Sequence, residues 1–179
     1  MEIPDGWWLT VEVPWGFGIR PEAYTVDEGL RAWYDMRVTM NDAECTEAPD
    51  PAIGHTADDL IGAWSARPGI VATAPQPISV GGLEGSWIDI HLAPDWTGTC
   101  PFDTTQPGVT LFTDADPASG NGTPFWGISG DEHLRIIALD DTAGSTVLIV
   151  LDTLTRETFD GLVAESMPVV DTFEFEVAP

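Results

Sequence analysis

The sequence predicts an α+β fold: a mainly antiparallel sheet flanked by two helices, in a single-domain sandwich that covers residues 1–179. Three observations support this prediction. Several runs are rich in β-branched and aromatic residues, as strands are. Two segments carry apolar residues at helical spacing behind a threonine that can cap a helix. The chain has one ordinary domain's length and shows no internal repeat, and its 43% hydrophobic residues suffice for a core.

The first third of the chain predicts two aromatic-rich strands, Gly6 to Val13 and Leu30 to Met40, separated by a turn-rich segment. A helix is then expected after Thr56, because its hydroxyl can cap a free N–H while Asp59 completes a capping box. This helix ends at Pro68-Gly69. Its apolar face, which we expect to lie on the sheet, contains Leu60, Ile61 and Trp64.

The rest of the chain predicts mainly strands. Gly81-Gly82 favours a tight hairpin between PISV and LEGSWIDIHL. Residues 93–131 are expected to form a long loop with one short strand, GVTLF. The strands HLRIIAL and TVLIVL follow, and the continuous apolar run Val147 to Leu151 predicts a central position in the sheet. Thr155 is expected to cap a second helix, and Pro168 to interrupt or kink the last turn of that helix. A strand-like tail, DTFEFEV, closes the chain.

The charge balance excludes several kinds of partner. Thirty acidic residues face six basic ones, all arginine, and the formal net charge is -24. This field repels phosphate backbones, so we expect no nucleic-acid partner. The chain contains no run of 18 apolar residues, so we expect no direct insertion in a membrane. The absence of lysine removes phosphate-loop and Schiff-base chemistry, and we expect no cofactor.

Two cysteines, Cys45 and Cys100, lie in turn-rich segments. A metal site would need further ligands at close spacing, and a nucleophile would need a base from among the three histidines. A disulfide needs only the other cysteine and is the favoured interpretation, with two unpaired buried thiols as the alternative. A disulfide in turn indicates an oxidising, extracytoplasmic compartment. The opening residues lack a secretory signal, so either the protein is cytosolic or a natural leader or membrane tether was trimmed from this chain. The cysteine pair favours the second alternative.

The chain resembles an uncharacterised family of secreted or lipid-anchored domains from actinobacteria and neighbouring bacterial groups. The resemblance runs from about Trp15 to Phe175 and rests on VPWGFGI, GLRAWYDMRVTM, Cys45, TADDLIGAWSARPGI, PISVGGLEGSWIDI, Cys100, LRIIALD, TVLIVLD and VDTFEFE. It implies a PsbP-like α/β/α sandwich, an extracytoplasmic and often membrane-tethered module, and a cysteine pair like the one here. It implies no catalytic residues.

Two groups of residues are candidates for ligand binding. In the strand WIDIHL, Trp87, Asp89 and His91 alternate with apolar residues and therefore share one face. They form either a ligand floor or a face that meets solvent or a helix, and a metal site there would need a third ligand from elsewhere. Trp33 and Trp126 belong to a set of tryptophans in edges and loops that either face a ligand or pack under long loops.

The leading hypothesis is a non-catalytic extracytoplasmic binding or sensing module, whose partner is a small molecule, a glycan or a protein. One alternative is a small secreted metal-assisted hydrolase that uses Asp89 and His91. Another is a structural spacer domain of an envelope protein. The acidic stretch Asp114 to Gly122 forms either a calcium site, with oxygens from Asp114, Asp116, Ser119 and Asn121, or an ordinary turn. It lacks the ligand spacing of an EF-hand loop, which favours the turn.

Overall fold

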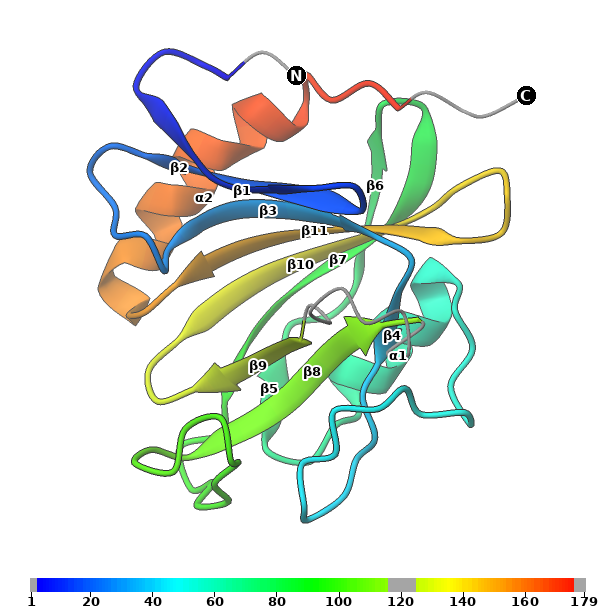
Figure 1. The fold of residues 1–179 in the computed structure, drawn as a ribbon, viewed down its shortest axis with the longest axis vertical. Coiled ribbons are helices and arrows are strands. Elements are labelled where there is room, and N and C mark those ends of the chain that lie inside the picture. Colours follow the sequence, from blue (N-terminus) through cyan, green and yellow to red (C-terminus); the bar gives the residue numbers. More distant parts are fainter. Residues whose placement is uncertain (1–2, 116–124, 176–179) are drawn as a thin grey trace.

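In a computed structural model, the described residues, 3–115 and 125–175, form eleven strands and two helices in two antiparallel sheets (Figure 1). The predicted α+β class, with a mainly antiparallel sheet and two helices, is confirmed. In this part of the chain, no helix is both long and apolar enough to cross a bilayer.

The large sheet is built around β11 (Thr146–Thr153), all eight residues of which are buried. This confirms the central position predicted from its apolar run. Its antiparallel order begins at β1 (Trp7–Val13) and continues through β2 (Gly16–Pro21), β3 (Gly29–Tyr34), β11, β10 (His133–Asp140), β7 (Leu83–Leu92) and β5 (Ile70–Ala72), while β6 (Gln76–Val80) also pairs with β7. The β6–β7 hairpin turns at Gly81 and Gly82, which have φ values of 56° and 84°, as the sequence predicted.

The small sheet contains β4 (Met36–Val38), β8 (Gly108–Asp114) and β9 (Phe125–Ser129). The single strand predicted from Leu30 to Met40 is wrong. The chain breaks at Asp35, whose φ of 60° is incompatible with extended backbone, and passes from β3 of the large sheet to β4 of the small one. The predicted turn segment before it contains β2, and the described part of the predicted loop 93–131 contains two strands, β8 and β9, where one was expected.

The first helix, α1 (Ala57–Ser65), begins as predicted. Thr56 Oγ1 accepts a hydrogen bond from Asp59 N, and the Asp59 carboxylate accepts one from Thr56 N, which completes the capping box. Leu60, Ile61 and Trp64 are all buried.

The second helix, α2 (Arg156–Val170), follows Thr155, but the Thr155 side chain makes no capping hydrogen bond. Pro168 lies inside α2 without ending it. The strand expected in the tail is absent from residues 171–175. Phe173 packs edge-on against Phe17 instead, with ring centroids 5.6 Å apart, so its apolar surface is partly buried by aromatic contact without strand pairing.

The two faces of the large sheet carry separate cores. On β10, Leu134 and Ile136 point to the core beneath α1 and the small sheet, whereas Ile137 and Leu139 point to the core beneath α2. Figure 1 shows α2 beside β2, β3 and β11, and α1 near β4 and β5. The small sheet and α1 thus cover one face and α2 covers the other.

Candidate functional site

A disulfide joins Cys45 to Cys100, with the two Cα atoms 5.6 Å apart, which confirms the predicted pairing. Cys45 lies in the segment after β4, and Cys100 in the segment before β8. Cys100 is buried, whereas Cys45 is half-buried and has a φ of 54°. The bond therefore holds two irregular segments together beside the small sheet.

Arg67 brings a buried positive charge to the same place. It follows the end of α1, and its Nη1 donates to the Thr39 carbonyl oxygen at 3.0 Å. Its Nη2 lies within hydrogen-bonding distance of Thr39 Oγ1 (3.1 Å), the Met40 carbonyl oxygen (2.7 Å) and Thr110 Oγ1 (2.9 Å). One side chain thus connects α1, the end of β4 and β8.

Arg67 and Asp42, which lie beside the disulfide, both keep their charge near neutral pH. Burial lowers the pKa of Arg67 to about 10, although Asp50 and Asp42 act in the opposite direction. The guanidinium therefore stays protonated. Hydrogen bonds from Thr46 hold the pKa of Asp42 below its ordinary value, so this carboxyl stays ionised.

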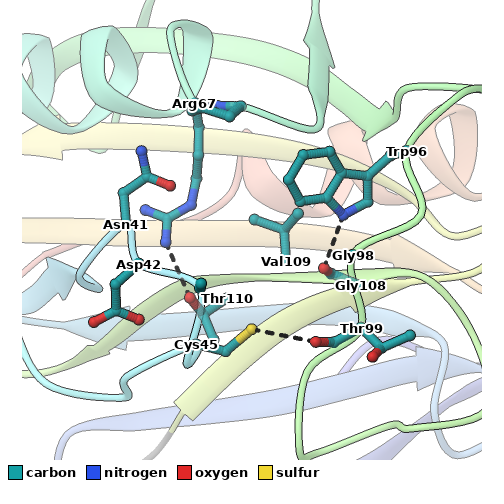
Figure 2. A pocket seen from close by; sticks show the side chains of 12 residues that line it. Asn41, Asp42, Cys45, Arg67, Trp96, Gly98, Thr99, Gly108, Val109 and Thr110 are labelled. Atoms are coloured by element: carbon teal, nitrogen blue, oxygen red, sulfur yellow. Dashed lines mark hydrogen bonds between the residues drawn. The ribbon is translucent and has the colours of Figure 1, made fainter.

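A cavity of about 480 Å³ opens between these elements (Figure 2). Trp96 and Val109 give it an apolar side, and Trp96 Nε1 is anchored by donation to the Gly108 carbonyl oxygen at 3.1 Å. A Cβ at Gly69 would lie 2.6 Å from the Trp96 ring, so the glycine makes room for the indole. The polar part of the lining comes from Asn41, Asp42, Arg67, Thr99 and Thr110. We define this space as the Cys45 cavity.

The residues predicted in the WIDIHL strand share one face of β7, on the side of α2. The Asp89 carboxylate accepts two hydrogen bonds from Arg135 of β10, at 2.7 and 2.8 Å. The same guanidinium lies over the Trp87 ring, 3.8 Å from its centroid. His91 stacks on His133 of β10, with ring centroids 4.9 Å apart. The Asp89 carboxylate, which the sequence predicted to bind a ligand, is thus bound by Arg135.

Trp33 and Trp126 lie on the opposite side of the large sheet from Trp87, among residues of the core beneath α1 and the small sheet. Trp33 is only 6% exposed, so its side chain packs in the core and does not face a ligand. Trp126 is partly buried and stacks on Phe112, with centroids 6.1 Å apart. The five residues predicted for ligand binding therefore do not come together in one site.

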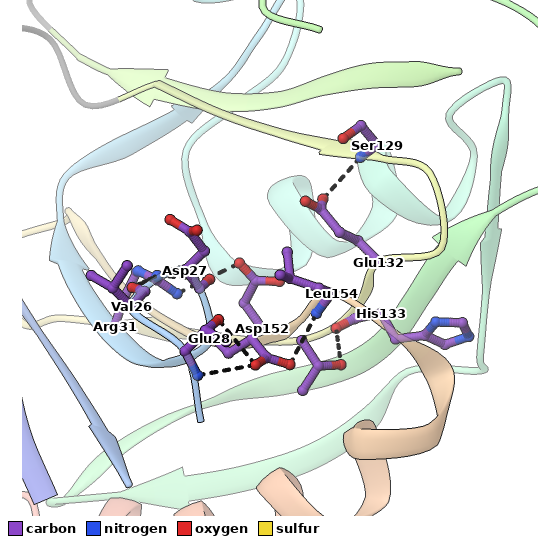
Figure 3. Close-up of polar contacts among 11 residues, drawn as sticks. Val26, Asp27, Glu28, Arg31, Ser129, Glu132, His133, Asp152 and Leu154 are labelled. Carbon is purple, nitrogen blue, oxygen red and sulfur yellow. Dashed lines mark hydrogen bonds and ion pairs between the residues drawn. The ribbon is translucent and has the colours of Figure 1, made fainter. Parts of the chain in front are cut away.

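A second polar cluster lies between the sheets (Figure 3). Arg31 Nη1 of β3 lies 3.5 Å from Asp152 Oδ2 of β11, and both side chains are more than nine-tenths buried. The Arg31 guanidinium also lies over the Trp126 ring, 4.5 Å from its centroid. Glu132 Oε2 accepts a hydrogen bond of 2.8 Å from Ser129 N.

Burial raises the pKa values of the acids in this cluster. The pKa of Asp152 rises to about 8 because of its burial and then the nearby Glu132, and Arg31 offsets only part of the rise. The pKa of Glu132 rises to about 7, again mainly by burial. None of these three side chains lines the Cys45 cavity. We therefore treat the cluster as a feature of core packing with a pH dependence.

Trp96 belongs to the set of edge and loop tryptophans that the sequence offered for recognition, but sequence reasoning did not single it out. The role of Arg67 was missed. An available signal was its position directly after the predicted helix, because a cation is rare in so acidic a chain. The hydrogen-bond partners of Arg67 are 27 to 43 residues away, and no local pattern indicates them.

The acidic stretch Asp114 to Gly122 lies, from residue 116 onward, outside the described residues. In the described ranges, no group of three or more His, Cys, Asp and Glu side chains is placed to hold a metal ion.

Comparison with known proteins gives no assignment: no family model, no curated protein and no solved structure matches this chain. The resemblance to secreted actinobacterial domains with a PsbP-like fold therefore stays a prediction. The protein is an α+β domain with a disulfide and, beside it, a cavity lined by a buried arginine.

Proposed function

We propose that this protein is a non-catalytic extracytoplasmic binding module, and that its ligand occupies the Cys45 cavity. The observation that carries the proposal is a preformed space of about 480 Å³, held by the disulfide and by the hydrogen bonds of Arg67. A volume of this size lies within the range of about 300 to 1,000 Å³ that is typical of small-molecule sites.

The lining favours a neutral ligand with an apolar face and a hydrogen-bonding edge. Trp96 and Val109 offer the apolar surface, and Asn41, Thr99 and Thr110 offer polar groups. A net charge of -24 repels anions. A sugar ring has the required combination of an apolar face and hydroxyls at its edge, so a neutral sugar is the ligand class we propose.

Binding is favoured over catalysis at this cavity because its charged groups do not exchange protons near neutral pH. The pKa of Arg67 is about 10, and hydrogen bonding lowers that of Asp42. A general acid or base works best with a pKa near the operating pH. The disulfide supports the proposed location, since the cytosol keeps most thiols reduced.

The test is saturation-transfer NMR with glucose, galactose, N-acetylglucosamine and their disaccharides. We expect at least one of these sugars to bind the oxidised protein, and Asn41→Ala and Trp96→Phe to weaken that binding at least tenfold. Trp8→Ala is the matched control, because Trp8 is 56% exposed and does not line the cavity. Absence of binding by the whole panel, or equal loss in the control, would count against a sugar in this cavity.

A further inference from the structure

A further cavity, of about 730 Å³, opens on the α2 side of the large sheet, at the end of the β1–β2 hairpin. Residues of β1 and β2 line one side of it, and the end of α2 and the tail that follows, residues 172–175, line the other. It shares no lining residue with the Cys45 cavity, and its volume is again typical of small-molecule sites. We define this space as the Phe17 cavity.

Three phenylalanine rings give the Phe17 cavity an aromatic wall. Phe17 of β2 meets Phe173 of the tail edge to face at 5.6 Å between ring centroids, and Phe173 meets Phe175 in the same way at 6.5 Å. A Cβ at Gly81 would lie 2.6 Å from the Phe173 carbonyl oxygen and 2.7 Å from the Phe175 ring, so the tail lies directly against the β6–β7 turn. This turn supports the aromatic wall from behind.

Two carboxylates belong to the same lining. Glu12 of β1 is paired in register with Phe17, so the two side chains project from the same face of the hairpin. Glu174 comes from the tail, between Phe173 and Phe175. Both glutamates are exposed, and within the described part of the chain neither side chain takes part in a hydrogen bond or an ion pair. Their negative charges are therefore available to a ligand.

No positive charge of the protein offsets these carboxylates. None of the six arginines lines the Phe17 cavity. Arg20, in the neighbouring part of β2, donates from its guanidinium to the carbonyl oxygens of Pro21 and Tyr24. Asp171, directly before the lining part of the tail, is a further exposed acid. Together with the net charge of -24, this lining attracts cations and repels anions.

The rest of the lining narrows the class of cation. In the described ranges, no group of three or more His, Cys, Asp and Glu side chains is placed to hold a metal ion. Apart from the two carboxylates, Thr172 is the one polar side chain among the described residues that line the cavity. A ligand rich in hydrogen-bonding groups would therefore leave most of them unpaired, and a neutral apolar ligand would not use the two charges.

We propose that the Phe17 cavity binds an organic cation with an apolar body, such as a quaternary ammonium that carries an alkyl chain. The apolar body packs against Phe17, Ile19 and Val169, and the ammonium lies beside Glu12 and Glu174. The face of an aromatic ring attracts a cation, and a quaternary ammonium donates no hydrogen bond that this lining would have to accept. The site is independent of the sugar proposed for the Cys45 cavity.

The test is isothermal titration calorimetry of the oxidised full chain with decyltrimethylammonium bromide at pH 7.5, below its micellar concentration. We expect one cation to bind per chain. Tetramethylammonium lacks the apolar body and sodium decyl sulfate carries the opposite charge, so each should bind at least tenfold more weakly. In NMR spectra, the amide signals of Phe17 and Thr172 should shift, and those of Thr99 and Thr110 in the Cys45 cavity should not.

Two variants test the carboxylates and the rings separately. The double variant Glu12→Gln/Glu174→Gln should weaken binding roughly fivefold or more, and so should Phe17→Leu, which keeps an apolar side chain but removes the ring. The matched control is Glu44→Gln/Glu47→Gln, which makes the same change in net charge at exposed positions outside the cavity. It should bind the cation as the unchanged protein does.

Failure of decyltrimethylammonium to bind, or unchanged affinity in both cavity variants, would overturn the proposal. Equal binding of decyl sulfate, or an equal loss in the control variant, would also overturn it, because either result indicates unspecific attraction to the chain or its net charge. The melting temperature of each variant is measured first. If Phe17→Leu does not fold, Phe175→Leu takes its place, and the same outcomes decide.

Discussion

Removal of the disulfide should lower the stability of this protein by an amount that follows from its position in the chain. The bond links residues 55 apart, so it closes a long loop in the unfolded chain. In the chain-entropy model, a loop of about this length changes the unfolding entropy by about 14 cal/mol/K, which is about 4 kcal/mol at 25 °C. This is a large share of the roughly 5 to 15 kcal/mol by which a domain is stable.

The corresponding change in melting temperature can be worked out from the size of the chain. With 179 residues and an unfolding entropy of about 2.1 cal/mol/K per residue, the total is about 380 cal/mol/K near 60 °C. A loss of about 4 kcal/mol then lowers the melting temperature by about 11 °C.

The assay compares thermal melts of the oxidised protein, the reduced protein and the double variant Cys45→Ala/Cys100→Ala. Cys100 is buried, so alanine also removes some packing there; the reduced protein keeps both side chains and isolates the effect of the bond. Reductant should leave the double variant unchanged. The reasoning would be refuted by a fully reduced sample, verified by thiol titration, that melts within about 2 °C of the oxidised protein.

Three further predictions concern other parts of the fold. Glu132, with a pKa raised to about 7, binds more protons in the folded than in the unfolded state between pH 4.5 and 7, so its contribution to stability falls as pH rises through that window. Glu132→Gln should therefore gain stability relative to the unchanged protein between pH 5 and 8, by at most about 3 kcal/mol; chemical denaturation at several pH values measures this, and a constant difference across the range would contradict it. Trp64 is fully buried and donates to the Leu111 carbonyl oxygen at 3.0 Å, so Trp64→Ala should cost about 3 to 5 kcal/mol of unfolding free energy. A cost below about 1 kcal/mol in urea unfolding, close to that of the exposed control Trp8→Ala, would show that the site repacks. Thr56→Ala should cost about 1 kcal/mol, because it removes the side-chain acceptor of the capping box; increased amide exchange in the first turn of α1 is the accompanying sign, and unchanged exchange there would argue against the cap.

The proposed ligand site depended much more on tertiary structure than the fold did. Sequence analysis named Trp87, Asp89 and His91 correctly as one face of a strand, but Asp89 is held by Arg135, which is 46 residues away. Nothing in a two-residue alternation indicates which partner a carboxylate will meet across a sheet. The same holds for Trp33, whose burial depends on what covers that face of β3.

By itself, the sequence determined the features that depend on neighbours along the chain. These are the capping box of α1, the Gly81-Gly82 hairpin, the buried run of β11 and, since only two cysteines were available, their pairing. Each rests on backbone geometry or side-chain chemistry within a few residues, or on a choice among very few partners. Only the tertiary structure decided the break at Asp35, the Cys45 cavity and the His91–His133 stack. Those features arise where strands and loops distant in sequence meet, and their energies depend on burial and on contacts that no local pattern encodes.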